Sequence, residues 1–281
     1  MWIVALVFAV LLLSGTAFAY LMGAVSVVSF LVADKAPYLS ILPQRIFAQL
    51  DVFAFMAMPL FILTAEIMSR AGVTRSLIDF ALSLVGRFRG GLGHVNIVTS
   101  IFFAGISGSA VADSASLSRI FVPEMVGRGY SRAYAGAVTA ASSMIGPIIP
   151  PSIIMIIYGG LTGTSVAALF VAGILPGLLL AAALLALNAG IATAKRHPGG
   201  ASDDLPAVWP SLLKAAPALC LPVVILGSLV FGLATPTEGS AIAVLVALIA
   251  GRFYDGLSRR ALFDALEATA QMTGTIFIIL A

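Results

Sequence analysis

The feature that most constrains this chain is a succession of apolar stretches separated by short polar or glycine-rich connections. Several of them approach the roughly 20 residues that an α-helix needs to cross a hydrocarbon core of about 30 Å. The alternation of polar and apolar residues that marks barrel strands is absent, so we expect the spans to be helices. The apolar stretches lie at 46–69, 91–104, 110–126, 133–160, 165–193, 211–231, 236–253 and from 271 onward.

Composition also indicates an integral membrane protein. Of the 281 residues, 60% are hydrophobic and only 10% are charged, and the mean hydropathy is +1.11. These values are far from those of a soluble domain. The formal net charge of +3 comes from basic residues at the ends of apolar stretches. Such a pattern reports orientation in a bilayer, so we expect a lipid environment and no nucleic-acid partner.

The N-terminal 32 residues allow two interpretations. Ala17, Phe18 and Ala19 resemble a signal-peptide cleavage site, but no basic residue precedes the apolar run and its apolar character continues to Val32. We therefore expect a membrane anchor. The run is long for one upright helix and short for two, so the number of spans stays open.

Basic residues mark one side of the membrane. By the positive-inside rule this side is cytoplasmic, and the connections at 159–165 and 232–240, which carry no basic residue, face outward. The mixed segment 72–90 suits a helix lying along the interface. Pro, Gly and acidic residues mark 194–210 as a cytoplasmic linker. The basic residues are Arg70, Arg75, Arg87, Arg89, Arg128, Arg132, Lys195, Arg196, Arg252, Arg259 and Arg260.

The segment 91–126 begins and ends beside arginines, which places both of its ends in the cytoplasm. It therefore predicts a re-entrant helical hairpin with arms of about 12 to 16 residues and a turn at 105–109, GISGS. Non-helical backbone at membrane depth survives only inside protein or beside a water-filled cavity. The start of the second arm would offer free N–H groups to a carboxylate, and the carbonyls ending the first arm would suit a small cation.

A second interruption lies at 142–160, where Gly146, Pro147, Pro150 and Pro151 break an apolar stretch. Each proline removes a backbone donor, which frees carbonyl groups in the preceding turn. A plain proline kink is the alternative, but a polar hairpin beside a broken helix is typical of secondary transporters that bind Na⁺ and anions near the midplane.

Several stretches together resemble the large membrane subunit, of the DctM or M type, of tripartite ATP-independent periplasmic (TRAP) transporters. The resemblance implies two inverted repeats with an elevator-like transport domain in the bacterial inner membrane. It also implies Na⁺-coupled import of organic acids such as dicarboxylates or sialic acid, with a periplasmic binding protein and a small four-helix membrane subunit as partners. The matching stretches, in family order, are PLFILTAEIMSRAGVTRSLIDFA at 59–81, VGRFRGGLGHVNIVTSIFFAGISGSAVAD at 85–113, IGPIIPPSIIMIIYG at 145–159, LFVAGILPGLL at 169–179 and TPTEGSAIAV at 235–244.

The resemblance also implies site residues, with Na⁺ as coupling ion, no organic cofactor and no catalytic group. We expect Asp113 to cap and orient the second arm; ligation through water and pairing with Arg119 are alternatives. Thr235 to Glu238 should form a structural helix start. The expected Na⁺ ligands, mostly backbone, are Ser107, Gly108, Ser109, Ser143 and Gly146. The expected substrate-binding residues are Ser107, Gly108, Ser109, Ala110, Asp113, Pro150 and Pro151.

The resemblance further divides the chain into parts. A first repeat covers 1–193, with the interfacial arm 72–90, the hairpin 91–126 and the broken helix 133–160. After the linker 194–210, residues 211–281 match only the opening of a second repeat. Because the second hairpin and second broken helix of the family pattern are missing, we expect a C-terminally incomplete chain or a remainder on another chain.

Two other functions are weighed. One is a Na⁺-coupled carboxylate carrier that works without a binding protein; the run of TRAP-like motifs argues against it. The other is an intramembrane serine protease, because Gly105-Ile106-Ser107-Gly108 forms a G-x-S-G string. Such an enzyme needs a histidine on a later helix, yet His197 lies in the linker and His94 precedes the serine. We do not expect an enzyme.

Overall fold

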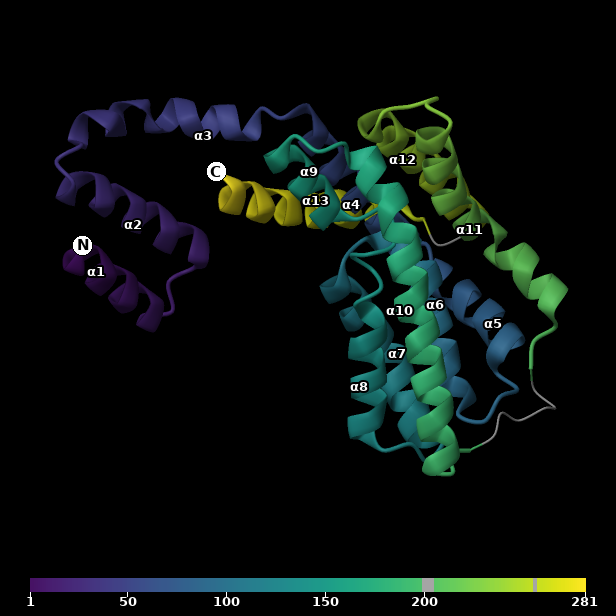
Figure 1. The fold of residues 1–281 in the computed structure, drawn as a ribbon. Coiled ribbons are helices and arrows are strands. Elements are labelled where there is room, and N and C mark those ends of the chain that lie inside the picture. The colour runs from purple at the N-terminus through teal and green to yellow at the C-terminus, as the bar shows by residue number, and fades with distance from the viewer. Residues whose placement is uncertain (199–204, 255–256) are drawn as a thin grey trace. The chain divides into compact units, whose positions relative to one another are not determined.

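The computed structural model describes residues 1–198, 205–254 and 257–281 (Figure 1). Within these residues there are thirteen α-helices, two short 3-10 helices and no strand, which confirms the all-α prediction. Four helical stretches are long and apolar enough to cross a membrane: Phe53–Arg70, Val166–Ala194, Val208–Val230 and Pro236–Phe253. The described chain is thus a multi-helix membrane protein by length and composition.

The chain forms two compact units, of which the first comprises Met1–Val52 and Ala270–Ala281. Its N-terminal run is two helices joined by a tight turn, in which Gly15 has a φ of +74°. Leu21 is the one buried residue of these two helices. The elements of this unit are α1 (Trp2–Leu13), α2 (Phe18–Val32), η1 (Ala36–Ile41), α3 (Leu42–Leu50) and the end of α13 (Arg259–Leu280).

The second unit, Phe53–Thr269, contains the hairpin and the broken helix. Helix α6 packs against α4, α5, α8, α10 and α11, and α7 packs against α8. Buried side chains such as Leu117, Phe121 and Val95 form the core between them. The elements are η2 (Phe53–Met56), α4 (Ala57–Arg70), α5 (Val73–Val85), α6 (Gly91–Ser107), α7 (Ala110–Gly127), α8 (Arg132–Ser143), α9 (Ile153–Thr162), α10 (Val166–Ala194), α11 (Val208–Val230), α12 (Pro236–Phe253) and most of α13.

Helix α12 begins as the sequence predicts. Thr235 is its N-cap and Pro236 its first residue, and Thr235 and Glu238 form a reciprocal capping box. The Glu238 N–H donates to Thr235 Oγ1 at 3.3 Å, while the Thr235 N–H donates to Glu238 Oε2 at 2.7 Å. Two otherwise unpaired N–H groups are satisfied in this way.

Helix α13 is longer than the apolar pattern indicates. The apolar stretch begins at 271, whereas the helix begins at Arg259. Its first half is rich in Ala, Leu, Glu and Arg, which have high helix propensity without being uniformly apolar. Hydropathy therefore missed its start. The connection between α10 and α11 is shorter than the expected linker 194–210, because Ala194 still belongs to α10 and α11 begins at Val208. Residues 199–204 of this connection lie outside the described residues.

Candidate functional site

The turn between α6 and α7 consists of two residues. Gly108 ends α6 in a left-handed conformation with φ of +59°, and its N–H donates to the carbonyl of Ala104 at 3.3 Å. Ser109 then caps α7 by accepting a hydrogen bond from the Ala112 N–H at 3.4 Å. The turn expected at 105–109 is narrower because 105–107 keep helical geometry. The arms have 17 and 18 residues, about 26 and 27 Å, so they are longer than the arms of about 12 to 16 residues that the sequence predicts.

The hairpin turn packs against the break in the apolar stretch that follows. Helix α8 ends at Ser143 and α9 begins at Ile153, so the break contains all three prolines. A Cβ added at Gly108 would collide with the carbonyl oxygen of Pro151 and lie 3.1 Å from Ser152 Cα. Only glycine combines this close approach with a positive φ. The hairpin turn and the break therefore touch through backbone atoms.

The break is held in its shape by Ser152. Its hydroxyl donates to the Pro147 carbonyl at 2.7 Å and accepts from the Met155 N–H at 3.3 Å. The same side chain thus caps α9 and closes the loop that precedes it. This arrangement presents the Pro151 carbonyl to the hairpin turn.

Asp113 connects the two segments. Its side chain is fully buried, and Oδ1 accepts a hydrogen bond from the Ser107 hydroxyl. Its other oxygen, Oδ2, has no hydrogen-bond partner among the described residues and faces Gly146, where an added Cβ would lie 2.5 Å away. The capping role expected for Asp113 belongs to Ser109, and Arg119 is exposed and forms no ion pair with Asp113 in the described chain.

Ser143 contributes a second oxygen at the same place. Its hydroxyl donates to the Thr139 carbonyl at 2.8 Å, so its side chain is engaged within α8. Its own carbonyl accepts from the Gly146 N–H at 3.1 Å and lies 3.2 Å from the position of an added Cβ at Gly146. Gly146 is therefore bordered by the Ser143 carbonyl and the Asp113 carboxylate.

The structure brings most of the expected site residues together. Ala110 begins α7 and Pro150 is buried in the break, but the contacts described above do not involve them. Those that meet at the turn and the break are Ser107, Gly108, Ser109, Asp113, Ser143, Gly146 and Pro151.

This arrangement fits a small cation. A buried carboxylate oxygen without a donor is costly unless a positive charge compensates it. Freed backbone carbonyls at a broken helix are the ligands that Na⁺ uses in secondary transporters. The neighbouring Ser143 carbonyl and Asp113 Oδ2 are both acceptors, so the site attracts positive charge.

A buried polar network, which the sequence analysis missed, holds the first hairpin arm against α8. The Asn96 amide donates to Thr139 Oγ1 at 2.7 Å, and the Ser100 hydroxyl donates to Ser142 Oγ at 2.9 Å. Ser142 also donates to Asn96 Oδ1 at 3.4 Å. The spacing in the sequence could have indicated this network. Asn96 and Ser100 are four residues apart, and Thr139 and Ser142 are three apart, so each pair shares one helix face.

The base of the hairpin is tied to the segment after α10. The Gly90 N–H donates to the Pro198 carbonyl at 3.0 Å. The His197 ring packs against Tyr130 and Tyr134, with ring centroids 4.8 and 4.5 Å away. Burial, with Lys195 nearby, lowers the pKa of His197 and favours its neutral form.

Neither histidine reaches Ser107. His94 lies in the first turn of α6, 13 residues before Ser107, and His197 packs at the hairpin base, so both lie at the opposite end of α6 from the turn. The Ser107 hydroxyl donates to Asp113 instead. The described geometry therefore offers no serine–histidine pair.

An all-helical apolar chain with a polar hairpin turn packed on a proline-broken helix is typical of the class of membrane permeases. Family comparison narrows the class. The family model described as "Tripartite ATP-independent periplasmic transporter, DctM component" matches residues 5–281. The chain belongs to this DctM family, the large permease component of TRAP transporters.

Relatives that are named for the compounds they transport support the assignment. The sialic acid TRAP transporter permease protein SiaT of Haemophilus influenzae is 37% identical over 238 residues, covering 84% of this chain and 39% of that protein. The sialic acid TRAP transporter large permease protein SiaM of Vibrio cholerae is 36% identical over 252 residues, covering 89% and 59%. The 2,3-diketo-L-gulonate TRAP transporter large permease protein YiaN of Escherichia coli is 36% identical over 242 residues, covering 86% and 57%. The chain thus spans between 39% and 59% of the length of these three relatives.

Proposed function

We propose that this chain forms part of the large membrane component of a Na⁺-coupled TRAP transporter in the bacterial inner membrane. It imports an organic acid anion, such as a dicarboxylate or sialic acid, that a periplasmic binding protein delivers, and a small membrane subunit accompanies it. The family and the relatives named for sialic acid and 2,3-diketo-L-gulonate support the transport role. The observation that carries the Na⁺ site is the unpaired Asp113 Oδ2 facing Gly146.

In this proposal Na⁺ is bound where the hairpin turn meets the break. Backbone oxygens of the hairpin turn and the break supply most ligands, and the Asp113 carboxylate supplies the negative charge. A bound cation would remove the cost of burying that carboxylate without a positive partner. The backbone ligands are those of Ser107, Gly108, Ser109, Ser143 and Gly146.

The substrate anion is bound at the start of α7. The first turn of a helix has N–H groups without helical partners and the positive end of the helix dipole, which favour a carboxylate. Ser109 and Ala110 stand at this end, directly after Gly108, which packs against Pro151 on the break. Na⁺ and the anion would lie on either side of one turn, so each reduces the electrostatic cost of binding the other.

The test of the Na⁺ site is Asp113→Asn, made in a full-length subunit that contains this segment and measured with its partners in proteoliposomes. Removing a buried charged ligand should raise the Na⁺ concentration for half-maximal uptake by about ten- to a hundredfold. Glu124→Gln is the matched control, because Glu124 is a half-exposed carboxylate on the same helix that pairs with Arg128 at 2.8 Å. The control should leave the Na⁺ dependence unchanged.

An unchanged Na⁺ dependence in Asp113→Asn would contradict the proposed site. Uptake that follows a pH gradient and not Na⁺ would assign the buried carboxylate to proton coupling instead. Omitting the binding protein tests the remaining alternative, since uptake at the same rate without it would identify a carrier that takes substrate directly from the periplasm.

A further inference from the structure

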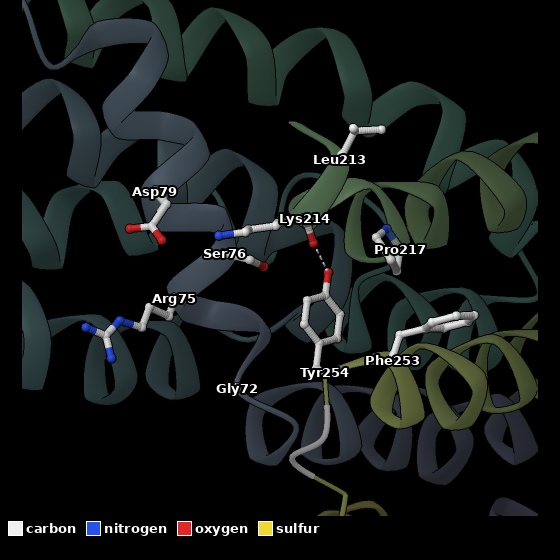
Figure 2. A pocket seen from close by; sticks show the side chains of 9 residues that line it. All are labelled: Gly72, Arg75, Ser76, Asp79, Leu213, Lys214, Pro217, Phe253 and Tyr254. Atoms are coloured by element: carbon white, nitrogen blue, oxygen red, sulfur yellow. Dashed lines mark hydrogen bonds between the residues drawn. The ribbon is translucent and has the colours of Figure 1, made fainter. Parts of the chain in front are cut away.

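A pocket of about 430 Å³ lies between α5, α11 and the end of α12 (Figure 2). None of its lining residues belongs to the hairpin or to the break. Tyr254, just after α12, donates a hydrogen bond through its hydroxyl to the Lys214 carbonyl on α11. The pocket volume is within the range of about 300–1,000 Å³ of ordinary small-molecule sites. It is therefore large enough for a polar headgroup.

Three charged side chains of the described residues line this pocket, and none of them takes part in an ion pair within the part of the chain that the structure describes. Arg75 and Asp79 are on α5 and Lys214 is on α11. Arg75 and Asp79 are four residues apart on one helix, yet no ion pair joins them, and Lys214 forms none within the described chain. In Figure 2 the Lys214 ammonium extends toward α5 on the side of Asp79, and the Arg75 guanidinium points away from it. Two cations and one anion give the described lining residues a net positive charge.

The rim of the pocket is apolar. Leu213 is 58% exposed and Phe253 is 76% exposed, although both are large hydrophobic side chains. Phe253 ends a stretch long and apolar enough to cross a membrane, so the pocket opens at the depth where hydrocarbon meets headgroups. The sequence places this end on the basic, cytoplasmic side, with Arg70 and Arg252 close by in the chain.

We propose that this pocket binds the headgroup of an anionic glycerophospholipid, with its phosphodiester between Arg75 and Lys214 and its acyl chains along Leu213 and Phe253. Basic pockets between membrane helices on the cytoplasmic side are typical lipid headgroup sites. A free phosphate ion would make no use of the exposed apolar rim. A choline headgroup would bring its own cation toward Arg75 and Lys214, so the net positive lining favours an anionic lipid.

Native mass spectrometry of a detergent-purified full-length subunit that contains this segment tests the proposal without reference to transport. Phosphatidylglycerol is titrated, and phosphatidylcholine and phosphatidylethanolamine with the same acyl chains are titrated in parallel. One phosphatidylglycerol should stay bound at a detergent dilution that strips phosphatidylcholine. Inorganic phosphate, added at millimolar concentration, should not displace it.

Variants then locate the binding. Each cation removed should weaken retention of phosphatidylglycerol about fivefold, so Arg75→Gln with Lys214→Gln should weaken it on the order of twentyfold. The matched control is Arg259→Gln with Arg260→Gln, two exposed basic residues outside the pocket, which should change retention less than twofold. The charge-preserving pair Arg75→Lys with Lys214→Arg should keep most of the binding.

Asp79→Asn distinguishes the kind of headgroup. If the headgroup is anionic, removing the one acidic lining residue strengthens retention of phosphatidylglycerol. Weaker retention of phosphatidylethanolamine after Asp79→Asn, with no gain for phosphatidylglycerol, would mean that a headgroup ammonium contacts Asp79 and would overturn the anionic assignment. Wild-type retention by the double Gln variant, equal retention of phosphatidylcholine, or displacement by inorganic phosphate would each overturn the site. Asp79→Asn also removes no cation, so it keeps the proposal testable if the double variant fails to fold.

Discussion

Two helical hairpins of this chain share a local design and differ in their surroundings. Both α1–α2 and α6–α7 join apolar helices through a turn with a left-handed glycine, Gly15 with φ of +74° and Gly108 with φ of +59°. An added Cβ at Gly15 meets nothing within 4 Å, whereas one at Gly108 would collide with Pro151. No residue of α1 is buried, while only Ile101 and Phe102 of the 17 residues of α6 are not.

The two hairpins also differ in how their polar groups find hydrogen-bond partners within an apolar chain. In α1–α2 the polar groups satisfy one another locally, since the Ser14 hydroxyl donates to the Leu11 carbonyl at 2.8 Å. In α6, Asn96 and Ser100 instead have partners on α8, so these two side chains hold two helices together. Polar residues within an apolar helix thus indicate what packs against it, while a uniformly apolar helix leaves its neighbours unspecified.

The largest expected effect is an all-or-none pattern of cysteine labelling. It tests on which side of the membrane the two ends of the α6–α7 hairpin lie. In a Cys220→Ala background, which removes the exposed native thiol, single cysteines at Phe88 and Arg132 should react with a membrane-impermeant thiol reagent only from the cytoplasm. A cysteine at Thr164, in the exposed connection before α10, should react only from the periplasm. Gly90 is unsuitable, because an added Cβ would lie 2.5 Å from Ala192 Cβ. Labelling of Phe88 and Arg132 positions from opposite sides would mean one crossing and no re-entrant hairpin.

The next largest effect is the difference in destabilisation between alanine substitutions at Gly15 and Gly108. Gly15→Ala should cost roughly 1–2 kcal/mol, the strain of a left-handed residue with a Cβ. Gly108→Ala adds the collision with Pro151, roughly a further 1–3 kcal/mol of overpacking, and should abolish uptake in a full-length subunit. Thermal unfolding of the two variants in detergent measures the difference. Equal destabilisation would show that the hairpin turn does not pack on the break.

The smallest expected effect is the difference in destabilisation when a polar side chain is removed from each of the two hairpins. Asn96→Ala leaves buried Thr139 and Ser142 with fewer partners and should destabilise the protein by about 1–3 kcal/mol. Ser14→Ala, at an exposed turn with only local hydrogen bonds, should stay within about 0.5 kcal/mol of the parent. If Ser14→Ala proved as damaging as Asn96→Ala, burial would not be what separates the hairpins.

The fold features that the sequence could predict were mostly set by residues close together in the chain. Prolines marked the break after α8, Gly108 marked the turn, and Thr235 with Glu238 marked the start of α12 because capping and proline effects act within a few residues. The start of α13 was missed because an apolar window does not detect a charged but helix-forming segment.

The arrangement of Asp113 could not be predicted in this way. Its partner Ser107 lies on the other arm and Gly146 lies on the break, so its orientation depends on how three segments pack. A cap was the natural expectation from position alone, since acidic residues favour the first turn of a helix. The assignment of Na⁺ ligands stays a prediction for the uptake experiment to test.

The hydrogen bond from Gly90 to Pro198 has a consequence for how this protein is made. Pro198 leaves the ribosome roughly a hundred residues after Gly90, which takes about 5–20 s at ordinary rates of synthesis. The surface that covers Gly108 also arrives later, with Pro151. As it emerges, α6 has only the earlier helices α4 and α5 beside it, and the turn at Gly108 lacks the break that covers it. The turn would therefore meet lipid with unpaired backbone groups. Insertion of α6–α7 must therefore wait for the chain that follows, whereas α1 and α2 are apolar enough to enter the bilayer as they emerge.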